Sequence, residues 1–379
     1  MACLIKAPDA TGKGCVSFTT PERDNLIAKN PRARASIEAL KERYLIGLHH
    51  NWHDQAFNYD PLFDFSMAGE GDLIEQNGRE FARIGIDACN FAPPFFGSSP
   101  RTTFHWDVLN VSRAVAFKGI PDFFEAIRAI YDRGRDIRVL YLCPVPPAEA
   151  NGTTVHDIRQ SFESMFATRE RQLFNLITME WDYPFPLDLE TLAFFYRSSR
   201  VYVHPAPDER RCRTAAYAWA DRMPVVARGN VGSILPEGLR SSPFLHEFGD
   251  AGEMADAILR GLDHPSDEDP QWNDVALEFS SVESGKRLSH FLDGLARSRG
   301  QRMSAKPINI GKLDIRLGRH HLTVSGQNGL PQDLAAFCKA LAELGDAAIC
   351  SAAQAADPEV HIGESSRTGP VERLLKRFR

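Results

Sequence analysis

Hydrophobic and polar positions follow two different periods through the middle of the chain. Short apolar runs of strand length are separated by stretches in which apolar residues recur every three to four positions. The runs predict strands at 108–112, 137–143, 172–178, 200–204 and 224–227, and the stretches between them predict helices near 120–133, 155–170, 188–198 and 209–221. Strands that alternate with helices are typical of parallel β-α-β units. We therefore expect an α/β protein with an open, doubly wound sheet, which binds its ligand beyond the carboxyl ends of its strands.

The two ends of the chain carry a weaker pattern of the same kind. The first hundred residues contain an expected strand at 44–48, and the last eighty contain a β-α-β pattern with elements at 321–324, 331–344 and 347–350. The expected organisation is a first Rossmann-like domain, a second one and a C-terminal segment, at 1–100, 101–299 and 300–379. Because the first part is short for a doubly wound domain, the strand at 321–324 could join its sheet and complete it. A truncated first domain followed by an independent appendage is the open alternative.

Composition narrows the class of protein. The chain has 379 residues, 43% of them hydrophobic and 25% charged, with a formal net charge of −6. This composition excludes global disorder, and the negative balance does not favour a nucleic-acid partner. Seven scattered cysteines without a Cys-x-x-Cys pair argue against a disulfide scaffold or a zinc ribbon. With no apolar run long enough to span a bilayer, we expect a reduced, cytoplasmic protein.

The best candidate for chemistry is the segment 111–119, which reads Val-Ser-Arg-Ala-Val-Ala-Phe-Lys-Gly. Arg113 stands at the end of an expected strand, and Lys118 follows five residues later, directly before an expected helix. Two cations that converge with a helix N-terminus suit a diphosphate. The same two residues could be solvated surface cations, and the segment by itself leaves both interpretations open.

Several segments together resemble family 4 glycosyltransferases of the GT-B fold. The segment 111–119 is similar to that family's "GR…KG" motif, and the similarity continues, in the same order and spacing, at 138–142, 189–203, 223–227, 232–237 and 248–250. The resemblance implies two Rossmann-like domains facing a cleft. It also implies transfer of a sugar from a nucleotide diphosphate donor to a glycan or other hydroxyl acceptor, with retention and with neither a cofactor nor an obligatory metal. Within it, Arg113 and Lys118 match the diphosphate-binding pair, and Gly119, Gly232 and Ser233 belong to the same substrate site.

The family's paired glutamates are only half present. Glu209 takes the place of the first glutamate, which contacts the donor sugar, whereas Tyr217 stands where the second would hold the nucleotide ribose. From the residues alone, Glu209 could equally be an acid at a helix start, and Tyr217 a core residue. An inverting transferase, a nucleotide-sugar epimerase and a degenerate protein that binds nucleotide or glycan without turnover therefore stay open.

Two further segments carry weaker predictions. His49 and His50 follow the strand expected at 44–48, and in the resembled family a histidine on such a loop faces the donor sugar. Local hydrogen bonds of loop histidines are the alternative. The basic tail at 371–379 could touch anionic lipid at the inner face of the membrane or form a solvated terminal helix.

Overall fold

The computed structural model describes residues 3–49, 60–67, 82–99, 101, 103–145, 155–180, 187–207, 209, 212–240, 243–263, 269–310, 337–344 and 346. They divide into two compact units, the first within 1–87, 285–310 and 337–346 and the second within 88–284. These divisions differ from those expected at 100/101 and 299/300. Phe96 stacks on Tyr217, and the Ala92 N–H donates to the Phe279 carbonyl at 2.9 Å, so the segment before 100 packs on the second unit. The expected pairing of two Rossmann-like domains around a cleft stays a prediction.

The second unit contains a six-stranded sheet in which every paired neighbour is parallel. Its strands in chain order are β6 (Trp106–Val111), β7 (Val139–Val145), β8 (Phe174–Glu180), β9 (Ser199–His204), β10 (Val225–Ala227) and β11 (Leu245–Glu247). They lie in the order β11-β10-β9-β6-β7-β8. This is the 3-2-1-4-5-6 order of dinucleotide-binding folds, which reverses direction between β6 and β9. The predicted α/β fold with a doubly wound parallel sheet is confirmed.

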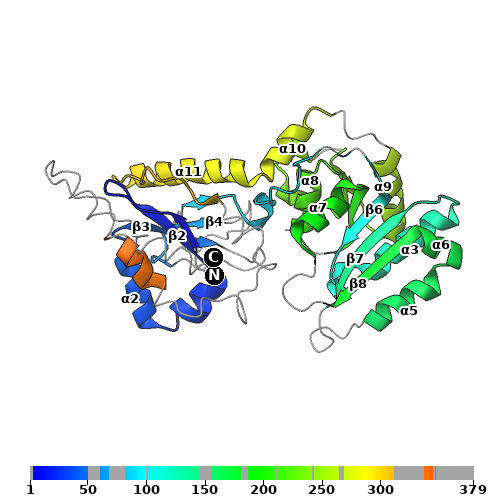
Figure 1. Cartoon of the computed structure of the whole chain (residues 1–379), viewed down its shortest axis with the longest axis horizontal. Helices are drawn as coiled ribbons and strands as arrows, with labels where there is room; N and C mark the ends of the chain where they lie inside the picture. The colour runs from blue at the N-terminus through cyan, green and yellow to red at the C-terminus, as the bar shows by residue number, and fades with distance from the viewer. Residues whose placement is uncertain are drawn as a thin grey trace, which may run out of the picture. The chain divides into compact units, whose positions relative to one another are not determined.

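Helices cover both faces of this sheet (Figure 1). One face packs against α3 (Ile120–Asp132), α5 (Val155–Met165), α6 (Thr168–Leu173) and α9 (Ala251–Asp263). The other packs against α7 (Leu189–Arg197), α8 (Arg213–Ala220) and α10 (Trp272–Glu278). Short 3-10 turns occur at η2 (Ala88–Asn90), η3 (Ala116–Lys118), η4 (Val231–Ile234) and η5 (Glu237–Leu239). The helix predicted at 155–170 is two helices, because the extended Ala167 starts a new one and its N–H donates to Glu170 at 2.7 Å.

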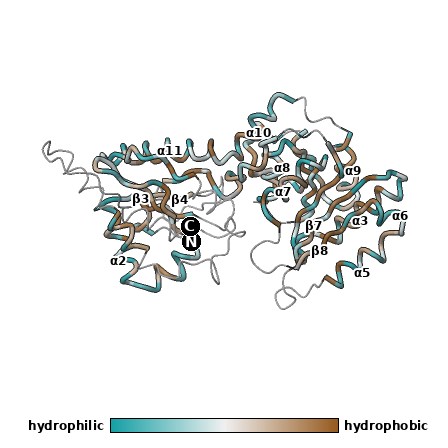
Figure 2. Tube along the Cα trace, in the orientation of Figure 1, coloured by the Kyte–Doolittle hydropathy of each residue, from teal (hydrophilic) through white to brown (hydrophobic). Residues whose placement is uncertain are grey.

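Helix α3 shows why the local sequence folds as it does. Gly119 caps it in the left-handed conformation at φ +66°, and a proline occupies its first turn, where its missing N–H costs nothing. Apolar residues at helical spacing then turn one face toward the sheet, where Phe124 packs against rings of α5, β7 and β8. Each fully buried side chain of this size contributes about 1.5–3 kcal/mol. The strands and inward helix faces accordingly carry the hydrophobic colour in Figure 2.

The first unit has a five-stranded sheet of order β1-β2-β3-β4-β5. Its strands are β1 (Cys3–Lys6), β2 (Gly14–Thr19), β3 (Tyr44–His49), β4 (Phe65–Met67) and β5 (Arg83–Ile84), and only the β1–β2 pair is antiparallel. Its helical segments are α1 (Thr20–Glu22), η1 (Arg23–Ile27) and α2 (Pro31–Leu40), and α11 (Ser281–Ser298) begins at the end of the second unit. The strand expected at 44–48 is therefore present.

The C-terminal segment contributes to the first unit. Helical residues 337–344 supply Cys338 and Leu341 to its core, and the Tyr44 hydroxyl donates to the Leu341 carbonyl at 2.8 Å. The strands expected at 321–324 and 347–350 and the basic tail lie outside the described residues, so it stays a prediction that the first of these strands joins the sheet containing β3. Among the described residues, no helix is both long enough and apolar enough to cross a membrane.

Candidate functional site

The loops after β6 and β9 approach each other at the reversal of strand order. Gly119 makes this approach possible, because a Cβ at its position would lie 2.5 Å from the Pro205 carbonyl oxygen. A side chain there would collide with backbone, and its φ of +66° would also be strained for any residue but glycine. The close contact holds Lys118, at the end of η3, against the loop that follows β9. Ligands of doubly wound folds bind at this point.

Four side chains from these two loops form one buried cluster. The Lys118 Nζ pairs with Glu209 Oε2, and His204 Nε2 lies 3.0 Å from the same oxygen. On the other side of the imidazole, Cys212 Sγ lies 3.2 Å from His204 Nδ1. His204 is fully buried, Lys118 is 8% exposed and the Glu209 side chain is 25% exposed. The carboxylate is thus the part of the cluster that a ligand reaches first.

The contacts in the cluster shift the pKa values of Glu209 and His204. Burial would raise the pKa of Glu209, but the contact with His204 and the positive charge of Lys118 outweigh it and lower that pKa to about 2. Burial would lower the pKa of His204, but the sulfur of Cys212 and the carboxylate of Glu209 raise it to about 9. This shift favours the protonated form of His204 at neutral pH and makes it a poor general base.

Glu209 lies before α8 and not within it. The helix predicted from 209 begins at Arg213, where Cys212 caps it by accepting the Ala215 N–H on Sγ at 3.4 Å. Glu209 therefore lies outside the first turn of α8, and its role in the site stays a prediction.

Arg113 lies on the same strand-end loop as Lys118. Its carbonyl accepts the Val115 N–H at 2.8 Å, and its side chain is partly exposed. The start of this loop is tied to β9, because Asn110 Nδ2 donates to the Val203 carbonyl at 3.0 Å, while Asn110 Oδ1 accepts from the Ser112 hydroxyl at 2.7 Å. Both predicted diphosphate ligands therefore occupy a segment that the sheet positions.

The loop after β10 borders the site as well. It carries Gly232 and Ser233 in η4, and Asn230 Nδ2 donates to the carbonyl of Pro207 at 3.1 Å. This bond joins it to the loop that bears Glu209. Because β10 is the parallel neighbour of β9, the two strand ends open at the same edge of the sheet.

The remaining predicted residues make no described contact with the cluster. Tyr217 is 2% exposed within α8 and stacks on Phe96 with ring centroids 4.3 Å apart, so it packs in the hydrophobic core. His49 is the last residue of β3 in the first unit, is buried, and accepts the Thr20 hydroxyl on its carbonyl at 3.3 Å. His50 lies outside the described residues.

His204 and Cys212 are members of the cluster that the sequence analysis did not single out. A signal for His204 was present, because it ends a strand of a parallel sheet, at the edge where ligands bind. Cys212 gave no such signal, since its contact with the end of β9 forms only in the folded unit.

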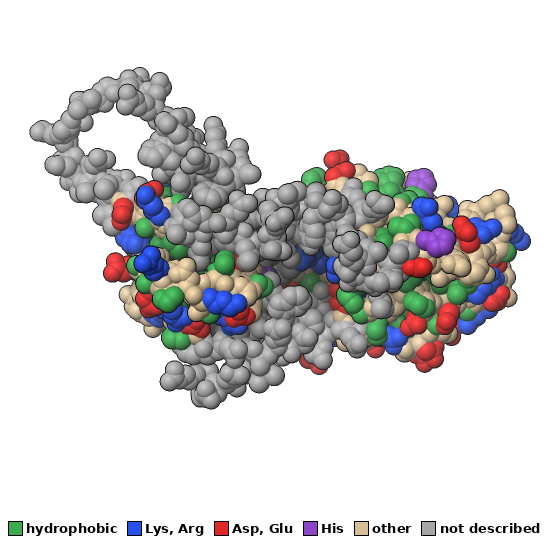
Figure 3. All heavy atoms as spheres, turned by 90° about the horizontal axis from the view of Figure 1, so that it is seen from below, with side chains coloured by type: hydrophobic (Ala, Val, Ile, Leu, Met, Phe, Trp, Pro, Cys, Tyr) green, Lys and Arg blue, Asp and Glu red, His purple; other side chains and the backbone are tan. Residues whose placement is uncertain are grey.

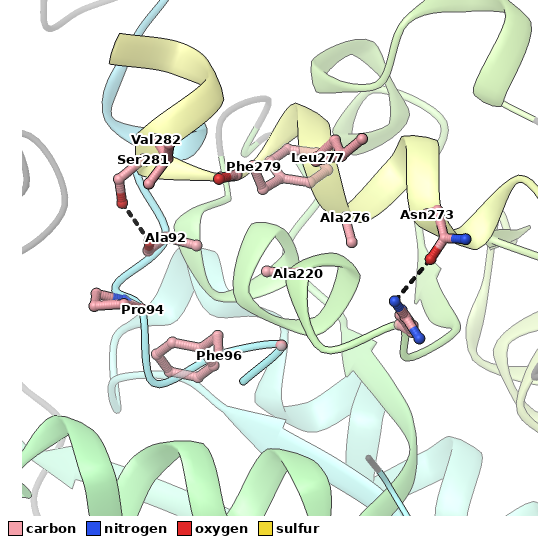
Figure 4. Close-up of a pocket in the computed structure, with 13 residues that line it drawn as sticks. Ala92, Pro94, Phe96, Ala220, Asn273, Ala276, Leu277, Phe279, Ser281 and Val282 are labelled. Atoms are coloured by element: carbon pink, nitrogen blue, oxygen red, sulfur yellow. Dashed lines mark hydrogen bonds between the residues drawn. The ribbon is translucent and has the colours of Figure 1, made fainter. Parts of the chain in front are cut away.

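The second unit also has a pocket of about 440 Å³. Figure 4 shows apolar side chains such as Phe96 and Phe279 around it, with the Ser281 hydroxyl donating to the Ala92 carbonyl at 2.8 Å. At its rim Arg222, at φ +57°, donates to Asn273 at 2.7 Å. Because it adjoins the C-terminal end of α8, whereas Cys212 precedes the N-terminal end, it lies away from the charged cluster. On the face seen in Figure 3, the described side chains of both charges are interspersed.

Comparison with known proteins finds similarity at the level of structure. No family model and no curated protein matches this chain. A UDP-forming trehalose-phosphate synthase from Burkholderia xenovorans aligns with a TM-score of 0.44 at 17% identity, over 69% of this chain and 71% of that one. The catalytic domain of starch synthase IV from Arabidopsis thaliana, bound to ADP and acarbose, aligns with a TM-score of 0.44 at 12% identity, over 76% and 74%. The chain is similar in structure to these two synthases, and its fold assignment rests on its own strand order.

Proposed function

We propose that this chain is a glycosyltransferase that moves a sugar from a nucleotide diphosphate donor to an acceptor hydroxyl, with retention. The observation that carries the proposal is the pairing of Lys118 with Glu209 at the reversal of strand order. It combines, at the expected ligand position, a cation for a diphosphate and a carboxylate for sugar hydroxyls. The motif resemblance assigns the same two residues to the same two tasks.

The proposed chemistry uses fixed charge. Arg113 and Lys118 stabilise the negative charge that develops on the departing diphosphate, which is catalysis by preorganised electrostatics. Lys118 has three donors, so it can keep Glu209 in place while it contacts a phosphate oxygen. Glu209 accepts hydrogen bonds from the donor sugar and orients it. In this mechanism cationic side chains neutralise the leaving group, and no metal step is required.

An inverting transferase or an epimerase needs a general base at the reacting centre. Cys212 and Glu209 raise the pKa of His204 to about 9, which makes this residue a poor candidate for that base. Analysis of the product anomer by NMR tests this part of the proposal, and a product with inverted configuration contradicts it.

Binding of nucleoside diphosphates tests the cationic pair. Lys118→Ala and Arg113→Ala should each weaken binding by about 1.5–3 kcal/mol, the scale of a hydrogen bond to a charged group. Arg169→Ala is the matched control, because Arg169 is a highly exposed cation on α6 in the same unit. Isothermal titration with a panel of nucleoside diphosphates measures the effect. Equal affinities in the wild type and both site variants would refute the assignment.

Turnover tests Glu209 separately. Glu209→Gln should lower the transfer rate while leaving the affinity for the free nucleoside diphosphate nearly intact, because the carboxylate is assigned to the sugar. A Glu209→Gln variant that transfers sugar at the wild-type rate would remove Glu209 from the mechanism.

A protein that binds without turnover is the second candidate. It is favoured by the position of Tyr217, which is buried against Phe96 where the resembled family has its ribose-binding carboxylate. Tight binding of a nucleoside diphosphate together with no hydrolysis or transfer across donors and acceptors would support this candidate.

A further inference from the structure

His204 lies behind the carboxylate of Glu209, out of reach of a ligand. Its side chain is fully buried, whereas the side chain of Glu209 is 25% exposed. His204 Nε2 lies 3.0 Å from Glu209 Oε2, and the Nζ of Lys118 pairs with the same oxygen. The described residues place no partner on the other carboxylate oxygen, Oε1. Any effect of His204 on a bound ligand therefore passes through the carboxylate.

The contact between the imidazole and the carboxylate is electrostatic. It is close, but its direction does not fit a hydrogen bond. Attraction between opposite charges requires proximity more than alignment, and it is stronger away from water. Burial alone would lower the pKa of His204, but Cys212 and Glu209 raise it to about 9, which favours the charged ring. His204 and Lys118 thus attract one carboxylate oxygen from two elements, the end of β9 and the end of η3.

Cys212 holds the opposite side of the ring. Its Sγ lies 3.2 Å from His204 Nδ1 and 3.1 Å from the Thr214 hydroxyl, and it accepts the Ala215 N–H at 3.4 Å. The sulfur is therefore held at the start of α8 by contacts within that helix. Because the contact made by one ring nitrogen orients the other, the position of the sulfur sets the direction in which His204 Nε2 faces.

Tyr202 supports the ring from the same face of β9. The two aromatic rings are nearly parallel, with centroids 6.5 Å apart, as expected for residues two positions apart on a strand. The Tyr202 hydroxyl donates to Thr214 Oγ1 at 2.6 Å, so it connects the strand to the helix start that carries Cys212. A strand end and a helix start together fix the imidazole, which is how rigid elements support a functional side chain.

We propose that His204 is a positioning residue for Glu209, and that Cys212 holds His204 in place for this task. This inference rests on the proposed function, because it assigns Glu209 to the donor sugar. One carboxylate oxygen is occupied by the protein, and the other is left to accept hydrogen bonds from sugar hydroxyls. The fixed carboxylate then holds the sugar in one orientation, and a displacement of about 1 Å at such a group costs roughly a hundredfold in rate.

Kinetics separate positioning from binding. The full-length protein is assayed for release of nucleoside diphosphate from UDP-glucose, ADP-glucose and GDP-mannose. His204→Gln should lower kcat by roughly tenfold to a hundredfold with little change in KM, because Arg113 and Lys118 still bind the diphosphate. Cys212→Ala should give a smaller loss of kcat, and Cys212→Ser should restore most of it, since a hydroxyl also accepts a hydrogen bond. Cys143→Ala is the matched control, because it changes a buried cysteine on the other face of the same sheet, and it should keep the wild-type kcat.

Imidazole ¹⁵N NMR tests the same contacts without any turnover. Protein labelled at histidine gives signals from the ring nitrogens, and the signals of His204 are those that disappear in His204→Gln. Glu209→Gln should shift the Nε2 signal of His204, and Cys212→Ala should shift its Nδ1 signal, because each variant changes one neighbour of the ring. Cys143→Ala should shift neither signal.

The two measurements distinguish a failure of this inference from a failure of the proposed function. A wild type that releases no nucleoside diphosphate from any of the probes contradicts the proposed function, and the NMR signals then decide whether Cys212 and Glu209 hold His204. A folded His204→Gln variant with the wild-type kcat overturns the positioning role and leaves the proposed function intact. A loss that appears in KM instead of kcat overturns it as well, and so do His204 signals that stay unchanged in both Glu209→Gln and Cys212→Ala.

Discussion

Replacing Gly119 by alanine should destabilise the second unit by about 2–4 kcal/mol. The left-handed conformation at φ +66° costs an alanine about 1–2 kcal/mol, and the reduced entropy of the unfolded chain returns about 0.4–1 kcal/mol of that. The new Cβ also meets the Pro205 carbonyl oxygen at 2.5 Å and its carbon at 2.9 Å. Both atoms are backbone, so the loops must separate, at about 1–3 kcal/mol for an overpacked contact.

Gly134 is a matched control for this substitution. It ends the same helix α3, has a φ of +74°, and has nothing within 4 Å of a Cβ built on it. Gly134→Ala therefore carries the conformational cost without the collision, and about 1 kcal/mol is expected. Urea unfolding followed by Trp fluorescence gives the free energy of unfolding for both variants.

The comparison isolates the approach of the two loops. If Gly119→Ala and Gly134→Ala destabilise the protein equally, the contact with Pro205 has no energetic weight and the argument for the positioning of Lys118 fails. A larger loss in Gly119→Ala, together with weaker binding of nucleoside diphosphates, is the expected result. Binding in Gly134→Ala should be unchanged, because Gly134 lies at the far end of α3.

Three further predictions concern buried groups of the second unit. The pKa of His204 rises from its ordinary 6.5 to about 9 in the folded protein. Its contribution to the free energy of unfolding is therefore complete below about pH 6.5 and is lost as pH rises through 9. The difference in free energy of unfolding between wild type and His204→Gln, measured by urea unfolding, should shrink between pH 6.5 and pH 9. Burial raises the pKa of Asp221 from 3.8 to about 7. The ionised carboxylate therefore lowers the free energy of unfolding as pH rises through 7. Asp221→Asn should raise the thermal midpoint at pH 8 but not at pH 4. A flat pH dependence would contradict either one. Phe124→Ala should lower the free energy of unfolding by about 3–5 kcal/mol, because the ring is buried among other aromatic rings. Phe194→Ala is the control, and it should cost less than about 1 kcal/mol because Phe194 is half-exposed. Equal losses in the two variants would argue against the aromatic packing of α3.

The residues of the site differ in how much of the information that identifies them lies close by in the sequence. Lys118 is identifiable from nine neighbouring residues, because they contain a cation before a helix start and a matching motif. Glu209 was found by the same motif, although the helix boundary beside it was placed four residues too early. The boundary failed because the cap is Cys212, whose sulfur accepts the Ala215 N–H and has no strong capping preference in sequence.

Sequence by itself determined the alternation of strands and helices and hence the α/β class of the second unit, because hydrophobic period is a property of neighbouring residues. Only the tertiary structure decided that β6 lies beside β9, which brings Lys118 to Glu209 across 91 residues. It also decided that Tyr217 is covered by Phe96, and that His204 and Cys212 complete a charged cluster. Such contacts depend on which strands pair and on how closely two loops approach. Both are set by packing over the whole unit, and no local pattern of residues encodes them.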